Sequence, residues 1–253
     1  MKYALVRKIP ACFDNCIKPI AKEQHINTPL AAEEHQSYCE TLSSLGITLI
    51  VLSPDETLPD CPFVEDTAVI VGKKALITRP GAESRRGEVT ATAEVLGHFL
   101  ELTWMEAPAT LDGGDVLQVG NTIFVGRTDR TNEAGIEFLT SWAGPQRTVI
   151  PIEVTNALHL KSIANVINGN TIVLSGKDLP KTYFSPYTVL YAPDEETERL
   201  SFLQIGNHVL LPSDCPETGK LFEEKGLILH SLNISEIRKA QAGLTCLSVL
   251  FET

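Results

Sequence analysis

A cysteine, a histidine and a carboxylate stand at three well-separated positions, which is the residue set that a cysteine-nucleophile enzyme requires. Cys246 lies in the segment GLTCLSV, His159 in LHLKS and Asp112 in LDGGDV. In such an enzyme the histidine takes or holds the thiol proton, and the carboxylate orients the histidine. Each residue also fits a structural role, because a cysteine that opens a strand, as we expect here, is usually a small hydrophobe. Spacing alone leaves both interpretations open.

Three further carboxylates occur within seven residues, at Asp60, Glu65 and Asp66. Carboxylates bind a guanidinium through charge-assisted, bidentate hydrogen bonds, so this group favours a guanidinium ligand. The alternative is a solvated acidic loop ahead of a strand. Basic residues form two other groups: Arg85 follows a Pro-Gly turn in RPGAESRRGE, and Arg130 lies in RTDRTNEAG. An arginine fork matches a carboxylate, although surface charge at a helix start explains these residues equally well.

Composition excludes several classes of protein. The 253 residues include 21 Lys and Arg against 32 Asp and Glu, a net charge of -11. This charge lacks the basic patch that nucleic acids require, whereas an acidic cleft concentrates small cations. No segment approaches the roughly 18 apolar residues of a membrane span. Six cysteines without an export signal predict reduced thiols in the cytoplasm. No nucleotide-binding or zinc-hydrolase motif occurs, so nucleotide binding and metal-dependent hydrolysis lack support in the sequence.

The elements that position these residues follow a repeated pattern. Two short apolar runs flank a turn centred on glycine, which tolerates the left-handed backbone of a tight hairpin. A helical segment and another apolar strand follow most of these hairpins. The four predicted hairpins span residues 68–77, 116–125, 164–174 and 201–211, and the predicted helices span 30–45, 87–100, 132–143 and 216–225.

Five units of two strands, a helix and a strand, each of about 50 residues, account for the whole chain. A period of this size indicates a solenoid or a propeller. The first predicted strand, 3–7, can pair with the last, 246–251, which favours a closed ring over the alternative of an ordinary mixed α/β sheet. No linker divides the sequence, so we expect a single domain over residues 1–253.

Taken together, the motifs resemble those of the dimethylarginine dimethylaminohydrolases (dimethylargininases) of the guanidine-modifying superfamily. The resemblance covers nearly the whole chain and implies a five-bladed α/β propeller of ββαβ units, the pentein fold, around a central site. The motifs that carry it, in family order, are LPDCPFVED, ITRPGAESRRGEV, ATLDGGDVL, GRTDRTNEAG, LHLKS and LTCLSV.

The resemblance also implies roles. Cys246 corresponds to the nucleophile, His159 to the general acid/base and Asp112 to the carboxylate that orients the histidine. The implied reaction converts Nω-methylated arginine to citrulline and methylamine or dimethylamine, through a covalent cysteine intermediate and without a metal or an organic cofactor. The implied partner is a small cationic guanidine. We expect the protein to be a monomer or a homodimer. The implied substrate-binding residues are Asp60, Glu65, Asp66, Arg85, Arg130, Ile17 of an N-terminal lid loop, and Ala240.

Two segments depart from the family pattern. Gln241 and Ala242 stand where an acid and a glycine are expected before the nucleophile, and ERLSFLQIG (198–206) replaces a stretch of the A-A-N-C type. Gln241 offers no negative charge to an α-ammonium group. Two alternatives therefore stay open: a hydrolase of arginine or another alkylguanidine with the same triad, and a guanidine-binding propeller without turnover.

Overall fold

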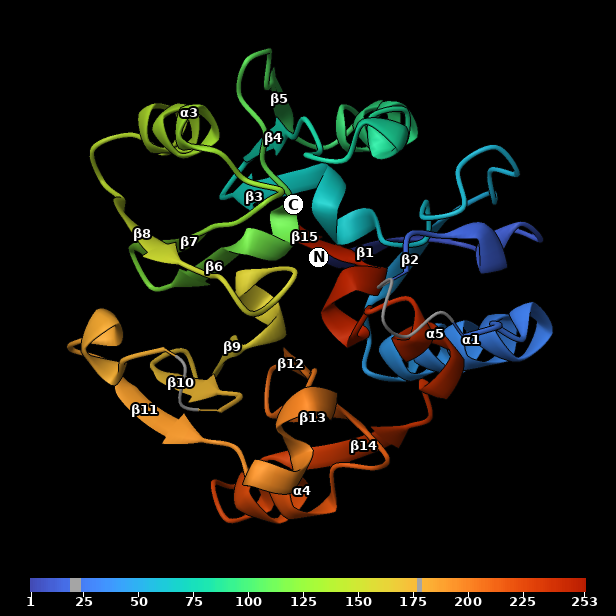
Figure 1. Ribbon diagram of the computed structural model, residues 1–253, viewed down its shortest axis with the longest axis vertical. Coiled ribbons are helices and arrows are strands. Elements are labelled where there is room, and N and C mark those ends of the chain that lie inside the picture. The colour runs from blue at the N-terminus through green and yellow to red at the C-terminus, as the bar shows by residue number, and fades with distance from the viewer. Residues whose placement is uncertain (19–23, 177–178) are drawn as a thin grey trace.

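Five three-stranded sheets surround a common centre in the computed structural model, which describes residues 1–18, 24–176 and 179–253 (Figure 1). In each sheet the inner strand pairs antiparallel with the middle strand, and the middle strand pairs parallel with the outer one. This arrangement is the expected five-bladed α/β propeller. From the first blade to the fifth, the inner strands are β15 (Val249–Glu252), β3 (Ala68–Val71), β6 (Val116–Val119), β9 (Ala164–Ile167) and β12 (Leu203–Ile205). The middle strands are β1 (Lys2–Arg7), β4 (Lys74–Ile77), β7 (Thr122–Arg127), β10 (Thr171–Leu174) and β13 (His208–Pro212). The outer strands are β2 (Thr48–Leu52), β5 (Glu101–Trp104), β8 (Thr148–Glu153), β11 (Thr188–Tyr191) and β14 (Ile228–Leu232).

The predicted hairpins are the inner and middle strands of blades two to five. Their turn glycines have positive φ angles of 60, 58, 70 and 61° at Gly72, Gly120, Gly169 and Gly206, a conformation that residues with a Cβ rarely adopt. A helix then connects each middle strand to its parallel outer strand in four blades. These helices are α1 (Thr28–Ser44), α2 (Val89–Leu96), α3 (Glu133–Ala143) and α4 (Pro216–Glu223). In the described part of the fourth blade, a short 3₁₀ helix, η7 (Lys181–Phe184), stands in this place.

The two ends of the chain close the ring as predicted. β1 pairs antiparallel with β15, with Tyr3 opposite Phe251, and the Met1 ammonium donates to the Thr253 carbonyl at 3.0 Å. One expectation is wrong: Cys246 does not begin the last strand. It lies in a 3₁₀ helix, η9 (Leu244–Leu247), and β15 begins only at Val249.

The apolar core is divided among the boundaries between neighbouring blades. Successive residues of a middle strand point to opposite faces, so Leu76 packs in the cluster between blades two and three, while Ile77 packs between blades one and two. Phe124 and Ile123 divide in the same way in blade three. Middle strands are therefore apolar on both faces. Because the core lies between the blades, the centre of the ring is left for polar side chains.

Candidate active site

Four short 3₁₀ helices bring the predicted site residues to the centre of the ring. Each of them directly precedes the inner strand of a different blade, so the repeat itself carries these loops to one place. They are η3 (Val64–Thr67), η5 (Gly113–Asp115), η6 (Leu160–Ser162) and η9. Glu65 and Asp66 lie in η3, Asp112 and His159 are the residues before η5 and η6, and Cys246 lies in η9.

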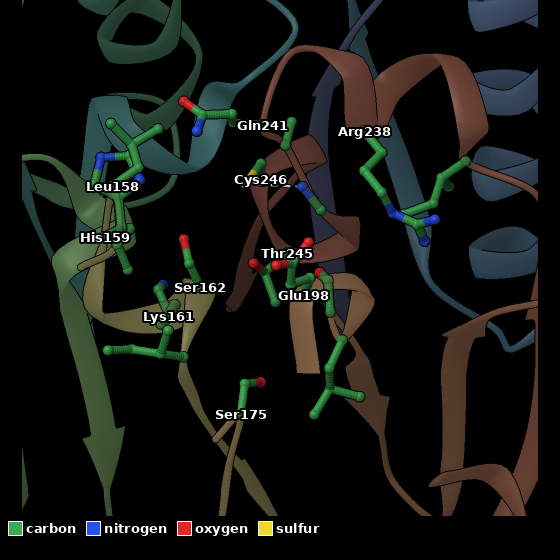
Figure 2. Close-up of a pocket in the computed structure, with 18 of the residues that line it drawn as sticks. Leu158, His159, Lys161, Ser162, Ser175, Glu198, Arg238, Gln241, Thr245 and Cys246 are labelled. Carbon is green, nitrogen blue, oxygen red and sulfur yellow. Dashed lines mark hydrogen bonds between the residues drawn. The ribbon is translucent and has the colours of Figure 1, made fainter. Parts of the chain in front are cut away.

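A cavity of about 680 Å³ opens at this place. Of the predicted residues, Glu65, His159 and Cys246 line it within the described part of the chain. Figure 2 shows His159 and Lys161 on one side and Cys246 with Gln241 on the other. The structure therefore brings together the proposed nucleophile, the proposed acid/base and one carboxylate, although they are far apart in sequence.

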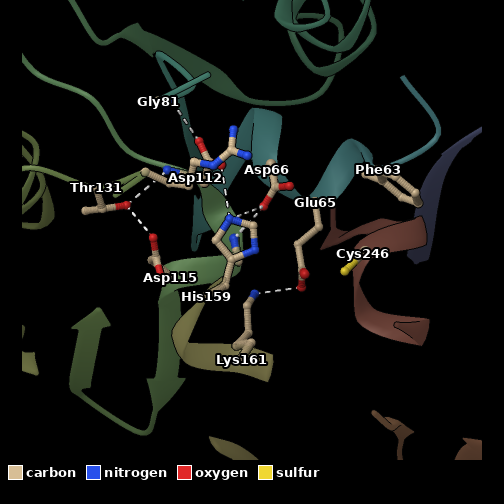
Figure 3. Close-up of polar contacts among 12 residues, drawn as sticks. Phe63, Glu65, Asp66, Gly81, Asp112, Asp115, Thr131, His159, Lys161 and Cys246 are labelled. Atoms are coloured by element: carbon tan, nitrogen blue, oxygen red, sulfur yellow. Dashed lines mark hydrogen bonds and ion pairs between the residues drawn. The ribbon is translucent and has the colours of Figure 1, made fainter. Parts of the chain in front are cut away.

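His159 is held as a buried cation. Its Nε2 lies 3.0 Å from Asp112 Oδ2 and 3.9 Å from Asp66 Oδ1. Burial alone lowers the pKa of His159, but the Asp66 charge and the Asp112 hydrogen bond outweigh it and raise the pKa to about 9. A side chain at Gly114 would place its Cβ 2.6 Å from His159 Nδ1, so the ring packs directly against this glycine. In Figure 3 the second ring nitrogen points toward Glu65 and Cys246.

Hydrogen bonds hold Asp112 at its side chain and at its backbone. Its Oδ1 accepts the Gly81 amide at 3.0 Å, and its own amide donates to Thr131 Oγ1 at 3.2 Å. Asp112 is fully buried. The carboxylate is therefore placed to orient the His159 ring.

Asp66 lies behind the histidine in a buried ion-pair cluster. Its Oδ2 accepts Arg85 Nη1 at 2.7 Å and its Oδ1 accepts the Gly114 amide at 2.9 Å. Although burial raises the pKa of Asp66, the charges of His159 and Arg85 lower it to about 2. Glu88 takes the other side of the Arg85 guanidinium, with an Nη2–Oε2 distance of 2.9 Å. Arg85 is thus engaged inside the fold and does not line the cavity in the described residues.

Glu65 presents an unusual acceptor. Lys161 Nζ donates to its Oε1 at 2.6 Å, while its Oε2 is buried with no hydrogen-bond partner in the described part of the chain. Burial raises the pKa of Glu65, and the Lys161 charge opposes that rise. A buried carboxylate oxygen without a donor is costly unless a ligand supplies one. Glu65 itself lines the cavity, so a cationic ligand bound there would lie beside this carboxylate.

Cys246 stands on the opposite wall with few partners. The thiol is half-buried, and the Gly243 amide approaches its Sγ at 3.4 Å. Burial and the negative charges of Glu65 and Asp66 raise the pKa of Cys246 to about 12. In Figure 3 its sulfur points toward the Glu65 carboxylate. The free protein at neutral pH therefore holds a thiol opposite an imidazolium.

The remaining predicted residues lie outside the lining of this cavity in the described residues. Asp60 is buried, and both its oxygens accept the Ile17 amide at 3.2 Å. Residues 19–23 of the expected lid loop lie outside the described residues. Arg130 is half-buried, and in the described structure its guanidinium has no hydrogen-bonded acceptor. Ala240 is buried at the end of α5 (Ser235–Lys239), next to Gln241, which has a positive φ of 57°.

Several residues support the site in roles that the sequence did not indicate. Asp115 accepts the Leu160 amide at 2.9 Å and the hydroxyls of Thr128 and Thr131, so it fixes the turn that carries His159. The second aspartate of LDGGDV was the available signal. The N-cap of α3 is Asn132, whose side chain accepts the Gly135 amide, while Thr131 is committed to Asp115. Lys161, in the quoted motif LHLKS, is the partner of Glu65.

One group of described residues has the composition of a metal site. Asp66, Asp112 and His159 place their ligating atoms within 4.8 Å of one another. Each is already engaged, Asp66 by Arg85 and Asp112 by Gly81. Metal binding requires neutral imidazole, whereas the raised pKa keeps His159 protonated at pH 7. These residues therefore fit an internal ion-pair network better than a cation site.

The described helices include none that is both long and apolar enough to cross a membrane. This agrees with the sequence, in which no apolar run reaches that length.

Comparisons with known proteins identify the family of the chain. Residues 3–182 match the family model described as "N,N dimethylarginine dimethylhydrolase, eukaryotic". An N(G),N(G)-dimethylarginine dimethylaminohydrolase of Streptomyces coelicolor is 34% identical over 255 residues, which cover 98% of this chain and 96% of the relative. The Pseudomonas aeruginosa enzyme of the same name is 31% identical over 226 residues, covering 87% of this chain and 88% of that protein.

Solved structures give the same result. A cysteine-to-serine variant of the Pseudomonas aeruginosa dimethylarginine dimethylaminohydrolase, complexed with citrulline, superposes with a TM-score of 0.94 at 26% identity and covers 98% of each chain. The N-terminal domain of the cyanobacterial arginine dihydrolase ArgZ shares the fold at 12% identity, with a TM-score of 0.87 and 99% and 98% coverage of this chain and that domain. On the family match, the identities and the full-length coverage, this chain belongs to the dimethylarginine dimethylaminohydrolase family.

Proposed function

We propose that the protein hydrolyses Nω-methylated arginine to citrulline and dimethylamine or methylamine, through a covalent intermediate on Cys246. The observation that carries this proposal is the shared cavity, which the Cys246 thiol, the His159 imidazolium and the Glu65 carboxylate all line. Family membership supports the reaction class. The citrulline bound to the Pseudomonas aeruginosa relative supports citrulline as the product.

Residues 1–253 act as a single catalytic domain in this proposal. The first and last strands share one sheet, and the four site-bearing turns belong to four different blades. A fragment that lacks one blade would therefore lose both ring closure and part of the site.

Substrate binding supplies the charge that the cavity requires. A guanidinium N–H group donates to Glu65 Oε2, the oxygen that has no partner in the described residues. The carboxylates of Glu65 and Asp66 offset the desolvation of the substrate cation. Toward the amino-acid end of the substrate we assign further contacts to Asp60, the Ile17 segment and the Ala240 backbone, by correspondence with the family. These residues lie outside the lining of the cavity in the described structure. Arg130 binds the carboxylate more readily than Arg85 does, because Arg85 is committed to Asp66 and Glu88.

The first half of the reaction forms a bond to sulfur. The bound cation lowers the pKa of the Cys246 thiol toward the working pH, because it offsets the Glu65 and Asp66 charges that raise it. As the cation binds, the Cys246 thiol gives its proton to solvent, because His159 is already protonated. The resulting thiolate attacks the guanidinium carbon and forms a tetrahedral adduct. His159 then donates a proton to the departing amine as the carbon–nitrogen bond breaks. A thiouronium-type intermediate remains on Cys246.

The second half returns the enzyme to its starting state. His159 is now neutral and takes a proton from water, which attacks the same carbon. The carbon–sulfur bond breaks, citrulline leaves, and Cys246 recovers a proton. Asp112 keeps the imidazole oriented and stabilises its charged form through both steps, in the way that a triad carboxylate does.

A citrulline assay on the purified protein tests the proposal. Dimethylarginine, monomethylarginine and arginine are compared in parallel, with Cys246→Ala as the control. We expect citrulline from both methylated substrates and none from the variant. Activity on arginine that exceeds activity on the methylated substrates would overturn the proposed substrate class, and turnover by Cys246→Ala would overturn the mechanism.

A further inference from the structure

Ser201 joins the fifth blade to the turn that carries the proposed nucleophile. It lies in the segment just before β12, is half-buried, and lines the same cavity as Cys246. This segment, ERLSFLQIG, departs from the family pattern. The proposed function assigns no role to Ser201.

Ser201 and Cys246 accept hydrogen bonds from two consecutive backbone amides of one turn. The Leu244 amide, at the first residue of η9, donates to Ser201 Oγ at 2.8 Å. The preceding amide, that of Gly243, donates to Cys246 Sγ at 3.4 Å. Amides in the first turn of a helix have no partner within the helix. The serine hydroxyl therefore satisfies one of them and fixes the peptide plane next to the amide that faces the sulfur.

The turn is packed directly on the serine. A Cβ at position 243 would lie 1.9 Å from Ser201 Oγ and 2.4 Å from Ser201 Cβ. Gly243 has an extended φ of -127°, so glycine is required here for space and not for its backbone freedom. This close approach means that a shift of Ser201 displaces the turn, and with it the Gly243 amide.

The Gly243 amide matters because the sulfur has little other support. It is the single hydrogen-bond donor to Sγ within the described residues, and the neighbouring carboxylates of Glu65 and Asp66 oppose ionisation of the thiol. A donor to the charged form favours that form. The direction of this N–H group therefore influences how much thiolate is present for attack.

We propose that Ser201 is a positioning residue for the nucleophile: its Oγ holds the Leu244 amide and thereby directs the Gly243 amide onto the sulfur of Cys246. This inference rests on the proposed role of Cys246. Ser201 itself touches neither the sulfur nor, in this account, the reacting carbon.

The decisive variant is Ser201→Ala, which removes the acceptor. The isosteric pair Ser201→Thr and Ser201→Val, one with and one without a hydroxyl, keeps the test informative where the alanine variant fails to fold. Ser175→Ala is the matched control, because Ser175 lines the same cavity on the fourth blade and has no hydrogen bond to η9 among the described residues.

Two measurements follow on each variant. The acid limb of the kcat profile against pH reports the thiol in the substrate complex; we expect Ser201→Ala and Ser201→Val to move it upward by about one pH unit, because a charge-assisted hydrogen bond is worth about that much. Ser201→Thr and Ser175→Ala keep the limb near its wild-type position. Loosening of the turn without any effect on the thiol would lower kcat at every pH and leave the limb in place, and that result would overturn the proposal.

The second measurement needs no turnover. Cys246 alkylation by iodoacetamide, followed by peptide mass spectrometry without substrate, is expected to slow about tenfold at pH 8 in Ser201→Ala, since iodoacetamide reacts with the thiolate. An unchanged rate would overturn the positioning role even if the protein hydrolyses a guanidine other than methylarginine. Failure of the proposed function would instead appear as missing citrulline with the alkylation difference intact.

Discussion

The two walls of the central cavity are built in opposite ways. The acid–base wall consists of His159, which lines the cavity, and of the buried residues behind it, Asp66, Arg85, Glu88 and Asp112. Its charges are matched by ion pairs and amide hydrogen bonds. The thiol wall, made of Ser201, Gly243 and Cys246, offers the sulfur a single amide donor in the described structure. Folding therefore fixes the protonation of His159, whereas the ionisation of Cys246 is left to the cationic ligand.

The difference in charge between the two walls limits reactions of the Cys246 thiol with molecules other than a cation. A thiol whose pKa is raised to about 12 by burial and neighbouring carboxylates is a poor nucleophile in the empty protein. Lys161 already offsets part of the Glu65 charge, and Arg85 and His159 offset part of the Asp66 charge. A cation bound in the cavity would add to these and lower the pKa of the thiol further. The acid, in contrast, is charged before the substrate arrives, so the proton for the leaving amine is already in place.

The largest expected effect comes from the thiol itself. Cys246→Ser removes the attacking sulfur, and we expect kcat to fall at least about a thousandfold. The change is nearly isosteric at a half-buried site, so the thermal unfolding midpoint should stay close to that of the wild type. Steady-state citrulline release and a thermal melt check the two expectations, and retained turnover would show that the thiol wall carries no nucleophile.

The next largest effect lies on the acid–base wall. Asp112→Asn keeps the shape but loses the charge that orients and stabilises His159, and we expect kcat to fall about a hundredfold or more. The pKa of His159 should fall as well, because the Asp112 hydrogen bond contributes to its rise. NMR titration of His159 measures this change. A wild-type kcat together with an unchanged titration would contradict the role of Asp112.

The dependence of activity on pH distinguishes the acid–base wall from the thiol wall. The pKa of His159 is raised to about 9, so the acid form is present below that value and is lost as pH rises through it. Because this value belongs to the free protein, we expect kcat/KM to fall about tenfold for each pH unit above 9, and this alkaline limb to move to lower pH in Asp112→Asn. The same sign holds for stability: the contribution of His159 is complete below about pH 6.5 and is lost as pH rises through 9. An alkaline limb that stays in place in Asp112→Asn would assign it to another group.

The smallest expected effect on turnover comes from behind the acid–base wall. Burial raises the pKa of Glu88 to about 7 although the Arg85 charge opposes that rise, so the variant is compared at about pH 8.5, where Glu88 is charged. Glu88→Gln then leaves the buried Arg85 with only the Asp66 charge, and we expect the free energy of unfolding to fall by about 2 kcal/mol, with kcat reduced only a few-fold. Glu83→Gln is the matched control, because Glu83 forms the equivalent i,i+3 pair with Arg86 at the surface. Denaturant unfolding of both variants makes the comparison. Equal losses would mean that burial of the Arg85 cluster does not matter.

Much of the fold could be predicted because its signals are local. Glycines such as Gly72 and Gly120 mark hairpin turns directly, since few other residues adopt their positive φ. Ring closure followed from the apolar pattern of the first and last strands. The start of the last strand was misplaced, because the apolar run CLSVLF does not distinguish a 3₁₀ turn at Cys246 from the strand that begins at Val249.

The site was harder to predict, because its partners come from different blades. The types and order of Cys246, His159 and Asp112 were sufficient to suggest a cysteine enzyme. The pairing of Lys161 with Glu65, however, spans 96 residues, and nothing local announces it. Arg85 resembled a surface cation in sequence, yet the structure buries it between Asp66 and Glu88. Such pairings depend on which loops the ring brings together.

In the proposed mechanism, Cys246 forms the covalent bond to the guanidinium carbon, and His159 is needed to hydrolyse the intermediate. S-methyl-L-thiocitrulline forms an adduct with a histidine-to-glycine variant of another dimethylarginine dimethylaminohydrolase. This compound provides a direct test, because its thiolate leaving group needs little help from an acid. Intact-protein and peptide mass spectrometry of His159→Gly after incubation with this compound should show a stable adduct on Cys246, and none in Cys246→Ala. An adduct on another residue, or none in His159→Gly, would contradict the account.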